Sequence, residues 1–339
     1  MSMAENTEVL DRTGINVVAI GGGNGLSTLL YGLKRHVFPD GDTLPAIAKL
    51  SAIVAVSDDG GSSGRLRDEL QMLPPGDIRN CMVALSEDSR LLSKLFEYRF
   101  RGKGDLGGHS FGNIFLAALT EMTGDFAEAV RISSEILASK GHIYPATIAD
   151  VRLAALLEDG TTVRGESKIG RIGRQIKRLY LEPETCKPLA GAIDAIGEAE
   201  IISIGPGSLF TSILPPLLVE GVPEAISASR ATKIFVCNLM TQPGETDGFN
   251  ARKHLEIVRD HAPQIEFDYI ILNNHPITSH QKEIYSLEGA AQIGVRGSIS
   301  ESTIEGVTII YDNLLRQGEM VRHDPARLAG AVLACSPKP

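Results

Sequence analysis

Short apolar runs alternate with longer amphipathic stretches along almost the whole chain. The runs are rich in β-branched residues, which is typical of buried strands, and the stretches between them have helical length. This alternation predicts an α/β fold of the doubly wound kind, a mostly parallel sheet with helices on both faces. The predicted strands are Asn16–Ile20, Ala52–Ser57, Ile176–Leu181, Ile201–Ile204, Lys233–Val236, Tyr269–Leu272 and Val307–Ile310. The predicted helices are Leu26–His36, Gly112–Thr123, Phe126–Ser139, Leu189–Ala199, Ala251–Ala262 and Asp324–Ala334.

One segment departs from this alternation. Val151–Leu157 and Thr161–Glu166 flank the turn sequence Glu158-Asp159-Gly160, which is typical of a β-hairpin. We therefore expect a small β-hairpin insertion near residues 151–166, within a single domain that spans residues 15–335. The sequence contains no tandem repeat and no obvious linker that would favour a second domain. Residues 1–14 are polar and acidic and are predicted to form a flexible N-terminal segment.

The charge and composition narrow the range of partners. The 339 residues carry a formal net charge of −9, which argues against a protein whose main partner is nucleic acid, because a basic surface supplies most of that affinity. One local basic stretch, Lys168–Arg178, is most simply a solvated strand or helix face. The first fourteen residues lack the profile of a signal peptide, and no apolar run approaches the length of a membrane span.

The cysteines and histidines indicate no disulfide scaffold and no zinc site. The four cysteines have no CxxC spacing, and the eight histidines follow no ligand pattern such as HExxH. A reducing, cytoplasmic environment fits this usage, so we expect a cytoplasmic protein.

The first candidate site is the glycine turn that follows the strand Asn16–Ile20. The turn leads into a helix, which is the setting in which backbone N–H groups bind a phosphate. The dinucleotide fingerprint GxGxxG does not fit, because Leu26 stands where the third glycine belongs, and no Walker lysine follows. A tight turn without a ligand is the alternative. The candidate ligand-binding residues are Gly21, Gly22, Gly23, Asn24 and Gly25.

A second turn of the same kind, GPGSLFTS, follows the strand Ile201–Ile204. Its hydroxyl groups lie where the first turn of a helix is expected and suit phosphate oxygens, although Ser and Thr also cap helices without any ligand. In a doubly wound sheet both turns open at the carboxyl edge, where such folds bind ligands. The candidate residues of this turn are Gly205, Gly207 and Ser208.

Polar residues cluster at four further places. Asp58 and Asp59 follow the second strand and are suited to accept ribose hydroxyls or to hold Mg²⁺ through water; a solvated, helix-capping loop is the alternative. Asp77 and Arg79 in LPPGDIRN are expected to begin a helix with their charges directed outward. Asn113 offers a donor and an acceptor to a base or sugar. In the loop from Asn238 to Thr246, the candidates for contact with sugar or base are Asn238, Thr241 and Gln242. The alternative is a connecting loop whose polar groups form hydrogen bonds within the protein and bind no ligand.

Six of these motifs, in this order, closely resemble the YvcK-type family of gluconeogenesis factors, part of the CofD-like superfamily. They are GGGNGLSTLLYGLK, AVSDDGGSSGRLRDEL, LPPGDIRN, GHSFGNIFLAAL, GPGSLFTSILPPLL and NLMTQPGET, and the match runs from about Asn16 to about Leu333. The resemblance implies a Rossmann-like nucleotide-binding fold in a cytoplasmic bacterial protein. The family is associated with cell shape, cell-wall precursor supply and growth on gluconeogenic carbon sources. It is similar to proteins that bind UDP-sugars, notably UDP-N-acetylglucosamine.

Two residues of the C-terminal part match positions that this family links to nucleotide-sugar binding. They are Arg322, in Val321-Arg322-His323-Asp324, and an upstream aromatic that fits Tyr285 best. A guanidinium suits a diphosphate, and a tyrosine ring can stack on uracil. Pro325 stands where some relatives have a phosphorylatable threonine, so phosphorylation is not expected there.

The enzymes of the superfamily imply an alternative function. They transfer a phospholactyl group from a guanylated donor to a deazaflavin precursor, and aspartates at positions comparable to Asp58 and Asp77 hold their metal. The extended motifs around Asp58 and Asn238 resemble the YvcK branch instead, so a binding and regulatory role is favoured. Mg²⁺ is the only cofactor that the sequence suggests. Whether the ligand is turned over stays open, as does the oligomeric state, with a homo-oligomer among the options.

Overall fold

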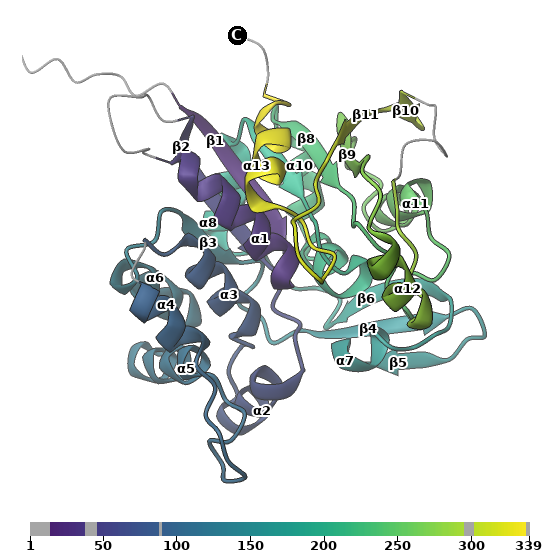
Figure 1. Cartoon of the computed structure of the whole chain (residues 1–339). Helices are drawn as coiled ribbons and strands as arrows, with labels where there is room; N and C mark the ends of the chain where they lie inside the picture. The colour runs from purple at the N-terminus through teal and green to yellow at the C-terminus, as the bar shows by residue number, and fades with distance from the viewer. Residues whose placement is uncertain (1–13, 38–45, 88–89, 295–301, 337–339) are drawn as a thin grey trace, which may run out of the picture.

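The computed structural model describes residues 14–37, 46–87, 90–294 and 302–336. Apart from residue 14, the predicted flexible segment 1–14 lies outside the described residues. The described residues form a large mixed sheet surrounded by helices, together with a smaller antiparallel sheet, as Figure 1 shows. The predicted α/β, doubly wound class is confirmed.

The large sheet has eight strands in the order β10-β11-β9-β8-β7-β1-β2-β3. All its pairs are parallel except β10 with β11. The strands are β1 (Ile15–Gly21), β2 (Ile47–Val54), β3 (His142–Pro145), β7 (Ile201–Ile204), β8 (Thr232–Val236), β9 (Tyr269–Asn273), β10 (Thr303–Ile304) and β11 (Val307–Asp312).

Strand β1 lies in the middle of this sheet and sets its topology. From β1 the chain builds β2 and β3 on one side, and it then returns to build β7, β8, β9 and β11 on the other side. The direction of winding therefore reverses between β1 and β7. In doubly wound sheets, the carboxyl ends of the strands at such a switch point form the ligand crevice.

Alternate residues of the central strands face opposite helix layers. Val17 and Ala19 pack in one core cluster, with the buried faces of α1, α3 and α13, while Val18 and Ile20 pack in the other, with α8, α9, α10 and α11. This period of two is the reason that the central strands are apolar throughout. The helices named here are α1 (Gly23–Leu33), α3 (Gly76–Leu85), α8 (Ala190–Glu198), α9 (Leu214–Leu217), α10 (Val222–Ala228), α11 (Ala251–His261) and α13 (Pro325–Leu333).

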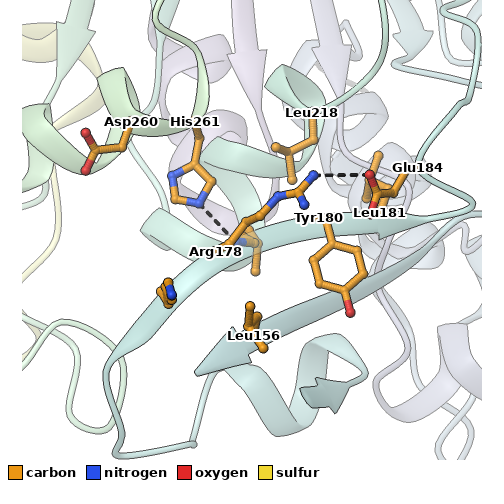
Figure 2. Close-up of a pocket in the computed structure, with 10 residues that line it drawn as sticks. Leu156, Arg178, Tyr180, Leu181, Glu184, Leu218, Asp260 and His261 are labelled. Carbon is orange, nitrogen blue, oxygen red and sulfur yellow. Dashed lines mark hydrogen bonds and ion pairs between the residues drawn. The ribbon is translucent and has the colours of Figure 1, made fainter. Parts of the chain in front are cut away.

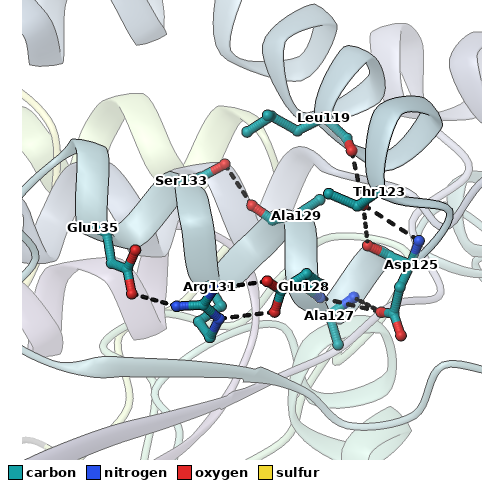
Figure 3. Close-up of polar contacts among 9 residues, drawn as sticks. All are labelled: Leu119, Thr123, Asp125, Ala127, Glu128, Ala129, Arg131, Ser133 and Glu135. Atoms are coloured by element: carbon teal, nitrogen blue, oxygen red, sulfur yellow. Dashed lines mark hydrogen bonds and ion pairs between the residues drawn. The ribbon is translucent and has the colours of Figure 1, made fainter.

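Between β2 and β3 the chain adds a group of helices, seen at the lower left of Figure 1. They are α2 (Gly61–Leu70), α3, α4 (Arg90–Glu97), α5 (Phe111–Thr123) and α6 (Phe126–Ile136). Figure 3 shows how the junction of α5 and α6 is held: the Asp125 carboxylate caps α6 by accepting from the N–H groups of Ala127 (2.7 Å) and Glu128 (3.1 Å). On the exposed side of α6, Arg131 pairs with Glu128 and Glu135.

The predicted hairpin is confirmed, but it belongs to a three-stranded sheet in the order β5-β4-β6. Strand β6 was predicted with the parallel strands; it pairs instead antiparallel with β4. The reason lies in its pattern, because Leu179 and Leu181 are buried while Lys177 and Arg178 are exposed, and strands of a two-sided parallel sheet are buried on both faces. The unit comprises β4 (Arg152–Leu157), β5 (Thr162–Arg164), α7 (Glu166–Ile169) and β6 (Ile176–Glu182).

Two further predictions about the strands needed correction. The second strand was predicted at Ala52–Ser57 but ends at Val54, because the apolar run continues into a buried loop whose Ala55 N–H still donates to the carbonyl of Gly21 (2.8 Å). The edge strand β3 was not predicted, because its sequence His-Ile-Tyr-Pro has a single β-branched residue and ends in proline. The remaining elements are the short helices Lys34–His36 and Leu209–Ile213, and α12 (Ser279–Leu287).

Among the described residues, no single helix is long and apolar enough to cross a membrane. One pair of helical segments meets the criteria of length and apolar composition when the two are taken together. It consists of Leu209–Leu217 and Val222–Ala228, which are bent by 73° relative to each other. The four cysteines are all buried and unbridged.

Candidate functional site

The two glycine turns meet in space at the switch between β1 and β7. A Cβ atom on Gly25 would lie 2.1 Å from the carbonyl oxygen of Pro206, so the first turn of α1 touches the backbone of the second glycine turn. Both turns also need left-handed backbone, at Gly23 (φ 60°) and Gly205 (φ 82°), which glycine adopts without strain. The prediction that both turns open at the carboxyl edge is confirmed by the strand order.

The first turn already binds an anionic group of the protein itself. The carboxylate of Asp77 accepts a hydrogen bond from the backbone N–H of Gly23, and a Cβ on Gly22 would lie 2.6 Å from its Oδ2. The residue as a whole is half-buried, but its carboxyl group is enclosed. Burial, followed by the charge of Asp58, raises the pKa of Asp77 from its ordinary 3.8 to about 7.

Asp77 and Arg79 therefore do not direct their charges outward, contrary to the expectation from the sequence. Arg79 is only 7% exposed, and burial lowers the pKa of its guanidinium. The inward direction follows from the packing, since the start of α3 lies against the Asp58 loop: a Cβ on Gly76 would come within 2.8 Å of Asp58 Oδ2.

Three more carboxylates lie around this point. Asp58 accepts from the N–H of Gly60 (2.8 Å), and Asp59 accepts from the N–H (2.9 Å) and hydroxyl (2.6 Å) of Ser167 at the start of α7. The three-stranded sheet is thereby fastened to the loop after β2. It also brings in Glu166, whose carboxyl group bonds to the Thr211 hydroxyl and whose pKa burial and the neighbouring aspartates raise to about 7.

The aspartates predicted as metal ligands are thus near each other, but they do not form a complete ion site. Among the residues that the structure describes, no three or more His, Cys, Asp or Glu side chains are arranged to hold a metal ion. Asp58 and Asp77 influence each other electrostatically, as two carboxylates facing one space do. Hard carboxylate oxygens suit Mg²⁺, which usually completes its shell with water and substrate phosphates. The pair fits such a partial site.

The second turn is clamped by the loop that follows β8. The amide of Asn238 accepts from the Gly207 N–H (3.0 Å) and donates to the Gly207 carbonyl (2.6 Å). Glu245 accepts from the Phe210 N–H (2.9 Å) and from the Ser208 hydroxyl, and it is buried enough that its pKa is raised. The predicted ligand residues Asn238 and Ser208 are therefore occupied in holding the turn's shape.

Thr241 and Gln242, the other two predicted site residues of this loop, differ in exposure and in hydrogen bonding. Thr241 is 4% exposed, and its hydroxyl accepts from the N–H of Ala291 (2.8 Å), so it fixes the loop to the chain after α12. Gln242 is half-buried; its side-chain oxygen lies 3.4 Å from the Asn238 amide nitrogen that donates to it. Gln242 is the side chain of this loop best placed to turn toward a ligand.

Asn113 lies in a buried network on α5 rather than against a glycine turn. Its amide donates to the Ser62 hydroxyl (3.0 Å), which also bonds to Nδ1 of His109 (3.0 Å). Its Oδ1 is buried and has no partner among the described residues. The network joins α2 to α5, and no hydrogen bond of the described residues links Asn113 to either turn.

Tyr285 and the Arg322 segment form a second group of predicted site residues. The Tyr285 hydroxyl accepts from the Val321 N–H (3.1 Å), so α12 holds the loop that carries Arg322. Arg322 is exposed, and Asp324 caps α13 by accepting from the N–H groups of Ala326 and Arg327. The prediction that Arg322 lies at the entrance of the last helix is confirmed.

His323 connects this second group to the sheet. Its imidazole bonds to the backbone of Cys237, the residue before Asn238, and burial of the ring lowers the pKa to about 4. Its Nε2 is buried without a partner among the described residues, although part of the residue is exposed. Sequence reasoning did not select His323, Glu245 or Glu166. The first two stood inside quoted motifs, whereas nothing in the pattern of the hairpin marked Glu166.

Three pockets of the described residues lie away from this edge. The pocket of about 430 Å³ in Figure 2 lies between β6, α9 and the end of α11. There, Nε2 of His261 accepts from the Leu179 N–H (3.0 Å), which joins α11 to the small sheet. None of the residues that line this pocket is a predicted site residue, so it carries no argument about the glycine turns.

The fold and the paired turns define a doubly wound α/β protein with its polar groups gathered at the switch point. Comparison with known proteins adds that a family model described as 2-phospho-L-lactate transferase CofD matches residues 17–315. The chain is 45% identical over 326 residues to the gluconeogenesis factor of Halalkalibacterium halodurans. The aligned region covers 95% of this chain and 97% of that protein. It is 43% identical to the gluconeogenesis factor of Bacillus subtilis, over 94% of this chain and 96% of the relative.

A solved structure is also similar to this chain. A crystal structure of a Bacillus halodurans protein of the upf0052 family superimposes with a TM-score of 0.87 at 44% identity, covering 94% of this chain and 99% of the other. The chain therefore belongs to the CofD-like superfamily and, within it, to the YvcK-type family of gluconeogenesis factors.

Gly25→Ala tests the contact between the turns. We expect it to lower the free energy of unfolding by several kcal/mol, on the scale of overpacking, because the new methyl group meets a backbone carbonyl at 2.1 Å. Urea unfolding measures this. Gly197→Ala, in α8 with open space around the site of the Cβ, is the control and should be neutral or stabilising by about 0.5–1 kcal/mol. Equal effects of both changes would mean that the turns do not touch as described.

Asp77→Asn tests the raised pKa. Between pH 4 and 7 the folded protein holds a proton on Asp77 that the unfolded chain releases, so this group's contribution to stability falls as the pH rises through that range and is constant above it. The difference between wild type and variant should change by at most about 1.4 kcal/mol per pH unit. Urea unfolding at pH 5, 6, 7 and 8 measures it, and a difference that does not depend on pH would contradict the assignment.

Proposed function

We propose that this protein binds a nucleotide sugar of the UDP-N-acetylglucosamine kind and acts as a regulator rather than a catalyst. The ligand would lie over the carboxyl edge of the sheet, across the switch between β1 and β7. The observation that carries the proposal is the contact of the two glycine turns at that switch, because doubly wound proteins bind ligands there.

The chemistry around the first turn suits a diphosphate. Helix α1 has no side-chain cap at Gly22, so N–H groups of its first turn, other than that of Gly23, can receive phosphate oxygens. Protonation of Asp77, favoured by its raised pKa, removes a negative charge that would otherwise repel the phosphate. Gln242 beside the second turn is the candidate for sugar or base contact.

The second group of residues supports the same ligand. Arg322 presents an exposed guanidinium on a loop whose backbone Tyr285 holds in place, and a guanidinium can bind a diphosphate through two parallel hydrogen bonds. The Tyr285 ring remains a candidate for stacking on uracil. His323 ties this loop to the end of β8, which is one strand away from the second glycine turn.

The regulatory role rests on the family. Relatives along nearly the full length are named gluconeogenesis factors. We therefore propose that binding of the nucleotide sugar reports on cell-wall precursor supply, and that the protein acts on cell shape and on growth with gluconeogenic carbon sources. We assign no catalytic residue.

A metal-dependent transferase is the second candidate. It is supported by the description of the matching family model and by the electrostatic coupling of Asp58 with Asp77. These two residues would hold Mg²⁺, which would neutralise phosphate charge when bound. The N–H groups of Gly60 and Gly23 would orient Asp58 and Asp77, respectively.

Thermal unfolding with a panel of ligands tests both candidates. UDP-N-acetylglucosamine and other UDP-sugars should raise the melting temperature, because a ligand that binds only the folded state stabilises it, whereas GDP, NAD and ATP should not. Absence of any shift with uridine nucleotides would refute the first proposal. Product formed from a guanylated donor and a deazaflavin acceptor with Mg²⁺ would establish the second candidate instead.

Arg322→Ala should weaken binding of UDP-N-acetylglucosamine by about 1.5–3 kcal/mol, the range for hydrogen bonds to charged groups. Folding should be unchanged, because the side chain is exposed. Isothermal titration measures the affinity. Arg230→Ala is the matched control, since Arg230 is exposed just before β8, at the opposite edge of the sheet. An affinity unchanged in Arg322→Ala would remove this residue from the site.

A further inference from the structure

The segment 90–109 differs in charge from the rest of the chain. It contains five basic and two acidic residues, whereas the whole protein carries a net charge of −9. It comprises α4 and a projecting arm, residues 98–109, which we call the basic arm. The charged residues of the segment are Arg90, Lys94, Glu97, Arg99, Arg101, Lys103 and Asp105.

In the basic arm, the backbone runs outward and returns antiparallel, and hydrogen bonds join the two halves. The Phe100 N–H donates to the His109 carbonyl and the Gly108 N–H donates to the Phe100 carbonyl, both at 2.9 Å. Arg65 of α2 supports its base by donating to the carbonyl of Gly107 (2.7 Å). Figure 1 shows the arm as the blue loop that projects from the bottom of the molecule between α4 and α5.

Large apolar side chains are exposed on this segment. Leu106 on the arm is 56% exposed and Tyr98 at its base is 48% exposed. On α4, Leu91 (80%) and Leu95 (41%) are four residues apart and therefore share a face of the helix. Apolar side chains gathered with basic ones on one segment mark an interaction surface.

Four cations of this segment have no carboxylate partner among the described residues, and of these Arg99 donates a hydrogen bond to the Gly108 carbonyl (3.1 Å). Among the described residues, Lys94, Arg99, Arg101 and Lys103 form no ion pair, whereas exposed Arg131 on the nearby α6 is paired twice. The arm is also open at its tip, since a Cβ on Gly102 or Gly104 would meet nothing within 4 Å.

We propose that the basic arm and the exposed face of α4 dock on an anionic lipid bilayer. The cations would contact headgroup phosphates, and Leu106 and Tyr98 would enter the boundary between headgroups and acyl chains. A bilayer accepts a convex, projecting element, whereas a peptide needs a groove. Exposed aliphatic residues suit lipid better than RNA, which binds through stacking on aromatic rings and through broader basic surfaces.

The absence of tryptophan from the chain allows a direct test of insertion. Leu106→Trp in the full-length protein provides a single emission signal. Vesicles with 30% phosphatidylglycerol in phosphatidylcholine should shift its emission to shorter wavelength, and pure phosphatidylcholine vesicles should not. No shift with the anionic vesicles would overturn the insertion and with it the proposal.

Vesicle sedimentation tests the residues. Arg101→Glu with Lys103→Glu should reduce binding to the anionic vesicles at least tenfold. Lys168→Glu with Lys177→Glu, which makes the same change in charge on another exposed basic stretch, should leave it nearly unchanged. Leu106→Ser should reduce binding several-fold, and Leu287→Ser, at an 86% exposed leucine on α12, should not.

Three further results would contradict the proposal. Equal losses in both charge variants would indicate a general effect of net charge. Full binding by Leu106→Ser would exclude an apolar contribution. Tighter binding of an oligouridylate than of the anionic vesicles, lost in the Arg101→Glu, Lys103→Glu variant, would make the arm an RNA-binding element.

Discussion

The contact between Gly25 and the carbonyl of Pro206 is the constraint on which the site depends. It lets the first turn of α1 lie directly against the turn after β7, and any side chain at Gly25 would separate them. Because β1 and β7 are neighbours at the switch point, this contact fixes how closely the two turns approach each other at the carboxyl edge. The helices α1 and α9 on the two faces are positioned by the same pair of strands.

Around this contact, side chains of the protein form hydrogen bonds to the backbone of the two turns. Asp77 occupies the N–H of Gly23, Asn238 holds both polar backbone groups of Gly207, and Glu245 holds the N–H of Phe210. These bonds fix the shape of the turns, and such preorganisation would reduce the entropy lost on binding of the proposed ligand. They also concentrate carboxyl groups with raised pKa values in one place, as functional sites often do.

The three-stranded sheet is packed against the large sheet. Its apolar side chains share a core cluster with β1 and β7, and through Glu166 and Ser167 it contacts both Thr211 and Asp59. The basic arm lies on the other excursion of the chain, between β2 and β3. The family model matches residues 17–315, so both excursions lie within the matched region.

The pattern of the sequence alone determined the fold class, the hairpin and the position of both glycine turns. These depend on local signals, apolar periodicity and glycine spacing, that act within a few residues. It also placed Arg322 correctly at the start of the last helix. Tertiary structure alone decided that β6 joins the small sheet, that Asp77 turns inward to Gly23, and that Asn113 bonds to Ser62 rather than to a turn. Each of these outcomes depends on a partner that is distant in sequence. The direction of a polar side chain follows from which donor lies across the gap, and no local pattern contains that information.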